Sequence, residues 1–156
     1  MNVTYRKAAA ADAHLLTRLR LDILKDEGVE MSAEEADGFC SASESYFIKA
    51  IQNNSFIAFI AEFNGEAVST AFMTLSERPP RKPQVPSLYG RIHSVFTYAS
   101  YRGMGLATRV LTLMIEEAKN RGAGNIDLLA TKDGESVYKK LGFFPINLTS
   151  MRLELT

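Results

Sequence analysis

The sequence predicts an α+β or α/β sandwich, in which helices flank a mixed and mainly antiparallel sheet. Hydrophobic periodicity gives the element order β-αα-βββ-α-β-α-ββ along the chain. Near its centre, two segments rich in aromatic and β-branched residues, Ser55–Phe63 and Glu66–Leu75, flank Asn64-Gly65. This dipeptide is a strong signal for a two-residue hairpin. Runs of strands interrupted by helices are typical of a sheet covered by helices.

The first third of the chain predicts one short strand followed by two helices. Val3–Lys7 has the composition of a strand. Asp12 is placed to cap the first helix, and Gly28 is placed to end it. Ser32-Ala33-Glu34-Glu35 is a capping box for the second helix. In the first helix, the apolar residues that recur at helical spacing are Leu15, Leu16, Leu19 and Ile23.

The middle of the chain predicts a loop, a strand and a long helix. Ser76–Ser87 holds all but one of the five prolines, so we expect a loop. Leu88–Thr97 is the next strand, and a long amphipathic helix follows until Gly122. One apolar face of this helix consists of Leu106, Val110, Met114 and Ala118.

The last third predicts a buried strand at Ile126–Ala130 and a short helix that Asp133 caps and Gly142 ends. Two closing strands are expected at Phe143–Asn147 and Met151–Leu155. The chain shows no internal repeat and no second core, so residues 1–156 are predicted to form a single domain.

Composition argues against several classes of function. Eighteen basic and eighteen acidic residues cancel, so no global field attracts nucleic acid or an anionic membrane. One cysteine cannot form an intrachain disulfide. The N-terminal residues lack the apolar core of a signal peptide, and no run approaches a membrane span. We therefore expect a cytoplasmic protein with neither nucleic acid nor membrane as a partner.

The segment Tyr101–Thr108 carries the clearest functional signal. Its glycines lie between a strand and a long helix, where they expose consecutive N–H groups beside the positive end of the helix dipole. Such a turn suits a phosphate or pyrophosphate. No lysine follows Gly105, which disfavours a P-loop, and Thr108 stands where the dinucleotide fingerprint needs glycine. A glycine-rich helix start without a ligand is the alternative.

Two motifs between Leu88 and Phe143 resemble the GNAT superfamily, the Gcn5-related N-acetyltransferases. Arg102-x-x-Gly105-x-Ala107 matches the Arg/Gln-x-x-Gly-x-Gly/Ala hallmark, and Tyr138-x-x-Leu-Gly-Phe matches a second element at the expected distance. The element order upstream also fits. The resemblance implies a GNAT fold and an acetyl-CoA-dependent N-acetyltransferase (an acyltransferase) that needs no metal.

The resemblance also implies how acetyl-CoA is held. Backbone groups of the strand that ends at Thr97 would bind the pantetheine arm like an added strand, and the amides from Gly103 to Thr108 would hold the pyrophosphate. Thr131 replaces an asparagine common in the family and could offer its hydroxyl to the arm. The implied cofactor-binding residues are Val95, Phe96, Thr97, Arg102, Gly103, Met104, Gly105, Leu106, Ala107, Thr108 and Thr131.

Two side chains are predicted to be catalytic. Tyr138 stands where the family places the group that protonates or hydrogen-bonds the leaving thiolate; the alternative is a core aromatic. The Val95 N–H would stabilise the oxyanion. His93 is the candidate base, nine residues before Arg102, and strand alternation predicts that it shares a face with Val95 and Thr97. A histidine that merely stabilises the strand is equally compatible with the sequence.

The acceptor is expected to be an amine of a small molecule or peptide, attacked without a covalent enzyme intermediate. The resemblance implies that the first two helices and their loop wall the acceptor pocket. Acidic residues cluster there and would suit a cationic amine, although charges at helix ends are usually solvated: Asp22, Asp26, Glu27 and Glu30. Two rivals remain: a same-fold transferase with a longer acyl donor or a hydroxyl acceptor, and a non-catalytic CoA sensor. A homodimer is also left open.

Overall fold

A five-stranded sheet forms the centre of the computed structural model, which describes residues 2–83 and 85–156. The strand order follows the chain, and each of the first four strands is antiparallel to the next. The last strand is parallel to its neighbour, which confirms a mixed and mainly antiparallel sheet. The strands are β1 (Val3–Lys7), β2 (Phe56–Phe63), β3 (Glu66–Glu77), β4 (Leu88–Thr97) and β5 (Ile126–Asp127).

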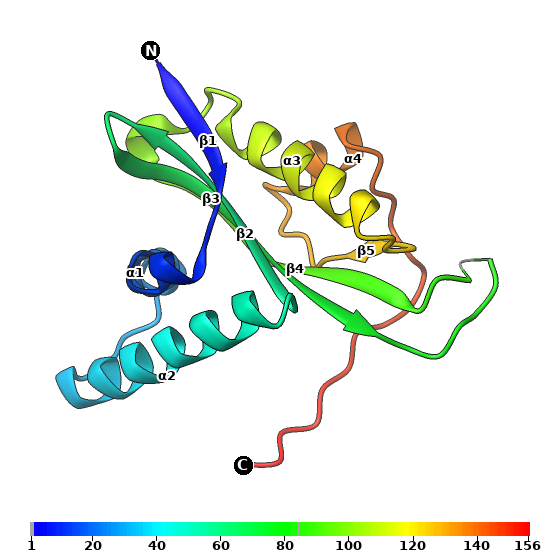
Figure 1. Cartoon of the computed structure of the whole chain (residues 1–156), viewed down its shortest axis with the longest axis horizontal. Coiled ribbons are helices and arrows are strands. Elements are labelled where there is room, and N and C mark those ends of the chain that lie inside the picture. Colours follow the sequence, from blue (N-terminus) through cyan, green and yellow to red (C-terminus); the bar gives the residue numbers. More distant parts are fainter. Residues whose placement is uncertain (1, 84) are drawn as a thin grey trace.

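Helices cover both faces of this sheet (Figure 1). On one face lie α1 (Ala13–Asp26) and α2 (Ala33–Gln52), and on the other lie α3 (Leu106–Asn120) and α4 (Glu135–Lys140). The 3₁₀ turns η1 (Ala10–Asp12) and η2 (Ala99–Tyr101) precede α1 and α3. Throughout the two described ranges, no helix is both long enough and apolar enough to cross a bilayer.

Strand alternation divides the interior into two cores. On β2, Phe56 and Ile60 pack with α1 and α2, whereas Ile57 and Phe59 pack with α3. Successive side chains of a strand point to opposite faces, so a strand buried on both sides reads as continuously apolar. The sheet is therefore the middle layer of the predicted sandwich.

Local signals placed several element ends correctly. Asn64 and Gly65 take positive φ values of 52° and 79°, as a two-residue hairpin turn requires. Ser32 Oγ accepts the Glu35 N–H at 3.1 Å, and the Glu35 carboxylate accepts the Ser32 N–H at 2.8 Å. The hairpin and the capping box are confirmed.

Asp12 behaves differently from expectation. It occupies the N-cap position of α1, but its side chain makes no capping bond to that helix. The carboxylate instead accepts the Ala9 N–H at 2.8 Å and pairs with the Arg6 guanidinium. A cation within reach competes with the helix amides, and a charged pair is the stronger bond.

The C-terminal third departs most from the sequence prediction. β5 ends at Asp127 rather than Ala130, and α4 begins at Glu135 without a side-chain cap from Asp133. Residues 143–156 contain no strand, although two were predicted there. Their alternating apolar side chains are 63–89% exposed at Phe144, Ile146, Leu148, Met151, Leu153 and Leu155. Apolar alternation makes a strand possible, but a strand also needs a hydrogen-bonded neighbour.

Two glycines should respond oppositely to an added methyl group. A Cβ at Gly90 would lie 2.6 Å from the sulfur of the fully buried Met73, whereas a Cβ at Gly38, within α2, meets no atom within 4 Å. We expect Gly90→Ala to lower the free energy of unfolding by about 1–3 kcal/mol through overpacking. Gly38→Ala should raise it by about 1 kcal/mol. Urea denaturation checks both, and a gain in stability for Gly90→Ala would contradict the close approach of the Met73 side chain to Gly90.

Candidate functional site

The candidate site lies where β4 and the segment after β5 separate. The two strands pair only at Gly90–Ile126 and Arg91–Asp127. Beyond these pairs, a cavity of about 560 Å³ opens among the end of β4, the start of α3 and α4. It is lined by Asp26, Val95, Phe96, Thr97, Tyr101, Arg102, Gly103, Gly105, Leu106, Ala107, Thr108, Leu111, Thr131, Asp133, Gly134, Val137 and Tyr138.

The β4 backbone presents hydrogen-bonding groups to this cavity. The Phe96 carbonyl accepts a bond from the Ser69 hydroxyl of β3, and the Tyr98 N–H donates to the Val68 carbonyl on that same side. Since the groups of successive strand residues point to opposite edges, those of Val95 and Thr97 point away from β3. The Val95 N–H and C=O therefore face the space where β5 no longer pairs with β4.

The glycine turn adds a row of donors. Gly103 and Gly105 have φ values of 77° and 76°, and Gly105 is the N-cap of α3. The first backbone bond of the helix runs from the Arg109 N–H to the Gly105 carbonyl at 3.1 Å. In the described part of the chain, the N–H groups of residues 103–108 donate to no backbone carbonyl. A helix start with free amides facing a cavity is suited to an anion.

Arg102 and Met104 have surroundings that the motif alone did not reveal. The Arg102 Nε donates to the Thr97 carbonyl at 2.9 Å, and its Nη2 lies 3.2 Å from an Asp26 oxygen. The motif arginine therefore ties the turn to the end of β4 and to α1. The Met104 side chain is exposed and does not line the cavity.

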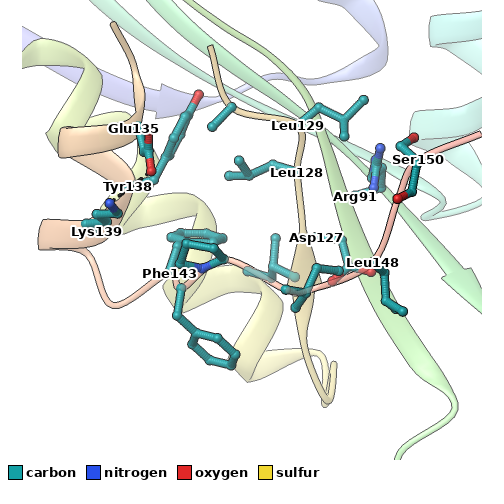
Figure 2. Close-up of a pocket in the computed structure, with 16 residues that line it drawn as sticks. Arg91, Asp127, Leu128, Leu129, Glu135, Tyr138, Lys139, Phe143, Leu148 and Ser150 are labelled. Atoms are coloured by element: carbon teal, nitrogen blue, oxygen red, sulfur yellow. Dashed lines mark ion pairs between the residues drawn. The ribbon is translucent and has the colours of Figure 1, made fainter. Parts of the chain in front are cut away.

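Tyr138 stands at the junction of two cavities. It lines the cavity at the glycine turn and a second one of about 510 Å³ beside β5. Its ring packs edge-on against Phe143, with centroids 5.8 Å apart, and the hydroxyl lies at the far end from Phe143 (Figure 2). No described residue hydrogen-bonds that hydroxyl, and burial raises the pKa of the phenol above its usual 10. At neutral pH, Tyr138 therefore contributes a protonated hydroxyl to the lining of the cavity at the glycine turn.

Thr131 lies across the cavity from β4. Its Oγ1 accepts the Gly134 N–H at 3.3 Å, so the hydroxyl proton remains available to a ligand.

His93 does not share a face with Val95 and Thr97, and that expectation is wrong. Phe72 of β3 pairs with Ser94 while Met73 pairs with Ile92, so His93 is the extra residue of a β-bulge. Its imidazole points to the α1–α2 side of the sheet, where Nε2 lies 2.8 Å from the Thr74 hydroxyl. A bulge interrupts the alternation on which the prediction depended, and nothing in the sequence marks its position.

A third cavity, of about 400 Å³, opens on this α1–α2 side. His93 lines it together with Arg20, which sequence reasoning missed. Helical spacing could have identified Arg20, because it lies four residues after Leu16 and three before Ile23, both buried on α1.

Two of the four acidic residues at and after the end of α1 already bond to other side chains of the protein. The Asp22 carboxylate accepts the Tyr98 hydroxyl bond, and Asp26 pairs with Arg102. Asp26 lines the cavity at the glycine turn, and none of the four acidic residues lines the third cavity. Within residues 2–83 and 85–156, no group of three or more His, Cys, Asp or Glu side chains could hold a metal ion.

The environment of His93 predicts a measurable titration. Partial burial, the nearby Arg91 and the nearby Arg20 all lower the pKa of His93 below 6.5. With only two histidines in the chain, ring-proton NMR resolves this titration, and a His14→Gln variant assigns it. Arg20→Gln should move the pKa of His93 upward, because it removes a repelling charge. An unchanged value in that variant would show that Arg20 does not act on the imidazole.

The chain is similar to known acetyltransferases in both sequence and fold. The model of the Acetyltransferase (GNAT) family matches residues 17–143. A crystal structure of a predicted acetyltransferase with acetyl-CoA from Clostridium acetobutylicum is 33% identical, with a TM-score of 0.84 over 99% of this chain and 97% of that one. A GCN5-related N-acetyltransferase from Ralstonia eutropha JMP134 shares the fold, with a TM-score of 0.79 and 20% identity over 97% and 99% of the chains.

A curated relative gives a partial match. The uncharacterized N-acetyltransferase YobR of Bacillus subtilis (strain 168) is 33% identical over 69 residues, and the match spans 42% of this chain and 28% of that protein. The family model, by contrast, covers both the glycine turn and Tyr138. The chain belongs to the GNAT family of acetyltransferases.

Proposed function

We propose that this protein transfers the acetyl group of acetyl-CoA to a primary amine by direct attack. The observation that carries the proposal is the composition of one cavity. Free amides at the start of α3, the outward backbone of β4 and the Tyr138 hydroxyl all border it. Family membership and the acetyl-CoA named in the Clostridium structure support the same donor.

We place the donor in this cavity according to the groups that line it. The amides of Gly103–Thr108 bind its pyrophosphate, and the pantetheine arm runs along Val95–Thr97 in place of a paired strand. The Thr131 hydroxyl donates to the arm from the opposite wall. This orientation directs the thioester toward the gap between β4 and β5.

Each chemical task has a candidate group: Val95 and Tyr138 beside that gap, and His93 on the other face of β4. His93 accepts a proton from the acceptor ammonium, directly or through water, and the free amine attacks the thioester carbon. The Val95 N–H stabilises the oxyanion, and as the C–S bond breaks the nitrogen loses its second proton to water or to the departing thiolate, which leaves the neutral amide and CoA. Tyr138 hydrogen-bonds the departing thiolate. Because burial raises its pKa while a thiol ionises near 8.5, Tyr138 acts mainly as a donor that keeps its proton.

His93 can serve from the opposite face of β4. The thioester would lie at the edge of β4, where no pairing with β5 extends beyond Arg91, and the proton would reach His93 around this edge through water. If His93 is the base, the acid limb of kcat/KM follows the pKa that NMR gives for its imidazole.

Acetyl-CoA binding and thiol release test the proposal together. Gly105→Val should weaken acetyl-CoA binding at least tenfold in calorimetry, because a side chain there strains the turn and enters the anion site. Gly122→Val is the matched control, since Gly122 has the same left-handed conformation, with φ of 82°, just past the other end of α3. It should lower stability similarly and leave acetyl-CoA affinity unchanged. Equal affinity in the two folded variants would exclude this turn as the binding site.

Turnover then separates the rivals. An amine panel that releases thiol supports the transferase. Acetyl-CoA binding without release from any amine or alcohol supports the sensor, and faster release from longer acyl donors supports a different donor.

Tyr138→Phe isolates the role of the hydroxyl. The ring still packs against Phe143, so stability should change little. We expect kcat to fall by roughly 10²-fold while the KM for acetyl-CoA changes little, because the lost bond forms mainly in the transition state. A donor with a more acidic thiol should partly rescue the variant. Full activity with ordinary acetyl-CoA would reduce Tyr138 to a packing role.

A further inference from the structure

We propose that the amine acceptor carries a carboxylate and an apolar body, and that Arg20 binds this carboxylate in the cavity between α1, α2 and β4. The inference rests on the proposed acetyl transfer and names the class of acceptor. It reverses the expectation of a cationic acceptor drawn from the acidic residues near the end of α1.

The cavity has an apolar wall and a polar wall. Phe39, Tyr46 and Phe72 contribute aromatic side chains, and Arg20, His93 and Ser94 contribute polar groups. The Tyr46 ring is half exposed and meets the buried rings of Phe47 and Phe56 edge to face, with centroids 5.5 and 5.9 Å away, so these contacts hold it at the cavity. A volume of about 400 Å³ lies in the range of small-molecule sites and suits a molecule of amino-acid size.

Arg20 retains most of its hydrogen-bonding capacity. Its Nη1 donates to the Ser94 hydroxyl at 2.9 Å, which fixes the guanidinium against β4. Across the described residues, no carboxylate lies within ion-pair distance of Arg20, and no acidic side chain lines the cavity. A half-buried guanidinium with its planar fork unpaired favours a bidentate partner such as a carboxylate.

The electrostatics of the cavity point the same way. Arg91 and Arg20 both act on His93 as positive charges. The nearest acidic residues of α1 are held elsewhere, Asp22 by Tyr98 and Asp26 by Arg102. A polycation entering here would meet like charge, whereas an acceptor carboxylate would neutralise Arg20.

The cavity brings the proposed carboxylate site at Arg20 close to the proposed base, His93, because both residues line it. Ser94, which holds Arg20, follows His93 and precedes Val95, whose backbone faces the gap. A carboxylate on Arg20 therefore leaves the amine of a small acceptor beside His93 and the edge of β4. An amino acid, whose carboxylate and amine are attached to neighbouring carbons, is a compact acceptor of this class.

Matched acceptors test the proposal. Phenylalanine, phenylalaninamide and phenethylamine share one apolar body and differ in the carboxylate, and spermidine represents a cationic acceptor. We expect kcat/KM for phenylalanine to exceed that for the other three by tenfold or more. Arg20→Gln should remove this preference and leave the KM for acetyl-CoA unchanged. Arg18→Gln is the matched control, because Arg18 is an exposed arginine of the same helix outside the cavity, and it should keep the preference.

Binding provides a readout that does not need turnover. N-acetylphenylalanine, the product of such a reaction, should bind the wild type in ligand-observed NMR and lose at least tenfold in affinity in Arg20→Gln. Efficient acetylation of spermidine without the carboxylate preference would overturn the inference while the proposed transfer stood. So would an equal loss for every acceptor in Arg20→Gln, or no detectable binding of the acetylated product. Failure of acetyl-CoA to bind would instead refute the proposed transfer, and product binding would still test Arg20.

Discussion

The divergence of β4 from β5 is the constraint on which the rest of the site depends. Two residue pairs hold the strands together, and the chain then leaves the sheet after Asp127. A ladder that continued would satisfy the outward Val95 and Thr97 groups internally and would close the cavity. Because it stops, β4 keeps an unpaired edge beside the free amides at the start of α3. Arg102 stabilises this arrangement by bonding the Thr97 carbonyl and pairing with Asp26 of α1.

The β-bulge on β4 gives the two faces of the sheet different tasks. The Val95 side chain packs on the side covered by α3 and α4, which, together with the loops beside them, also supply most residues that line the cavity at the glycine turn. His93 and Arg20 belong to the side covered by α1 and α2. One additional residue in the strand thus places a titratable ring on the face opposite the expected one. In the proposed reaction, donor and acceptor would therefore approach the edge of β4 from opposite sides of the sheet.

Features that depend on interactions between residues close in sequence were predicted correctly, whereas features that depend on distant residues were not. The Asn64-Gly65 hairpin and the Ser32 capping box depend on bonds within a few residues, and both were predicted correctly. The glycine turn is also local, and its placement before α3 matches the sequence. The side on which His93 lies depends on a register slip against β3, where the paired residues are 19 (Met73 and Ile92) and 22 (Phe72 and Ser94) positions apart, and local pattern does not encode it.

The prediction of two closing strands after Gly142 was wrong for a related reason. Alternation at Met151–Leu155 satisfies the side-chain rule for a strand, yet pairing needs an available neighbour, and β5 is too short to provide one within this chain. Asp12 shows the same lesson at the level of one residue. Aspartate is a good N-cap residue, but the Asp12 carboxylate pairs with Arg6 instead of the amides of α1.

The shortness of β5 also affects how binding energy is distributed. A strand held by two pairs, with single bonds at Gly124 and Asn125 beside it, opens at lower free energy than the four-stranded ladder. A pantetheine arm bonded along β4 would order the segment after β5 from the facing wall. Some of the affinity for the donor is then spent on ordering, and occupancy of the site stabilises this half of the fold by mass action. With the donor bound in this way, resistance to proteolysis around residues 128–134 would depend on donor concentration.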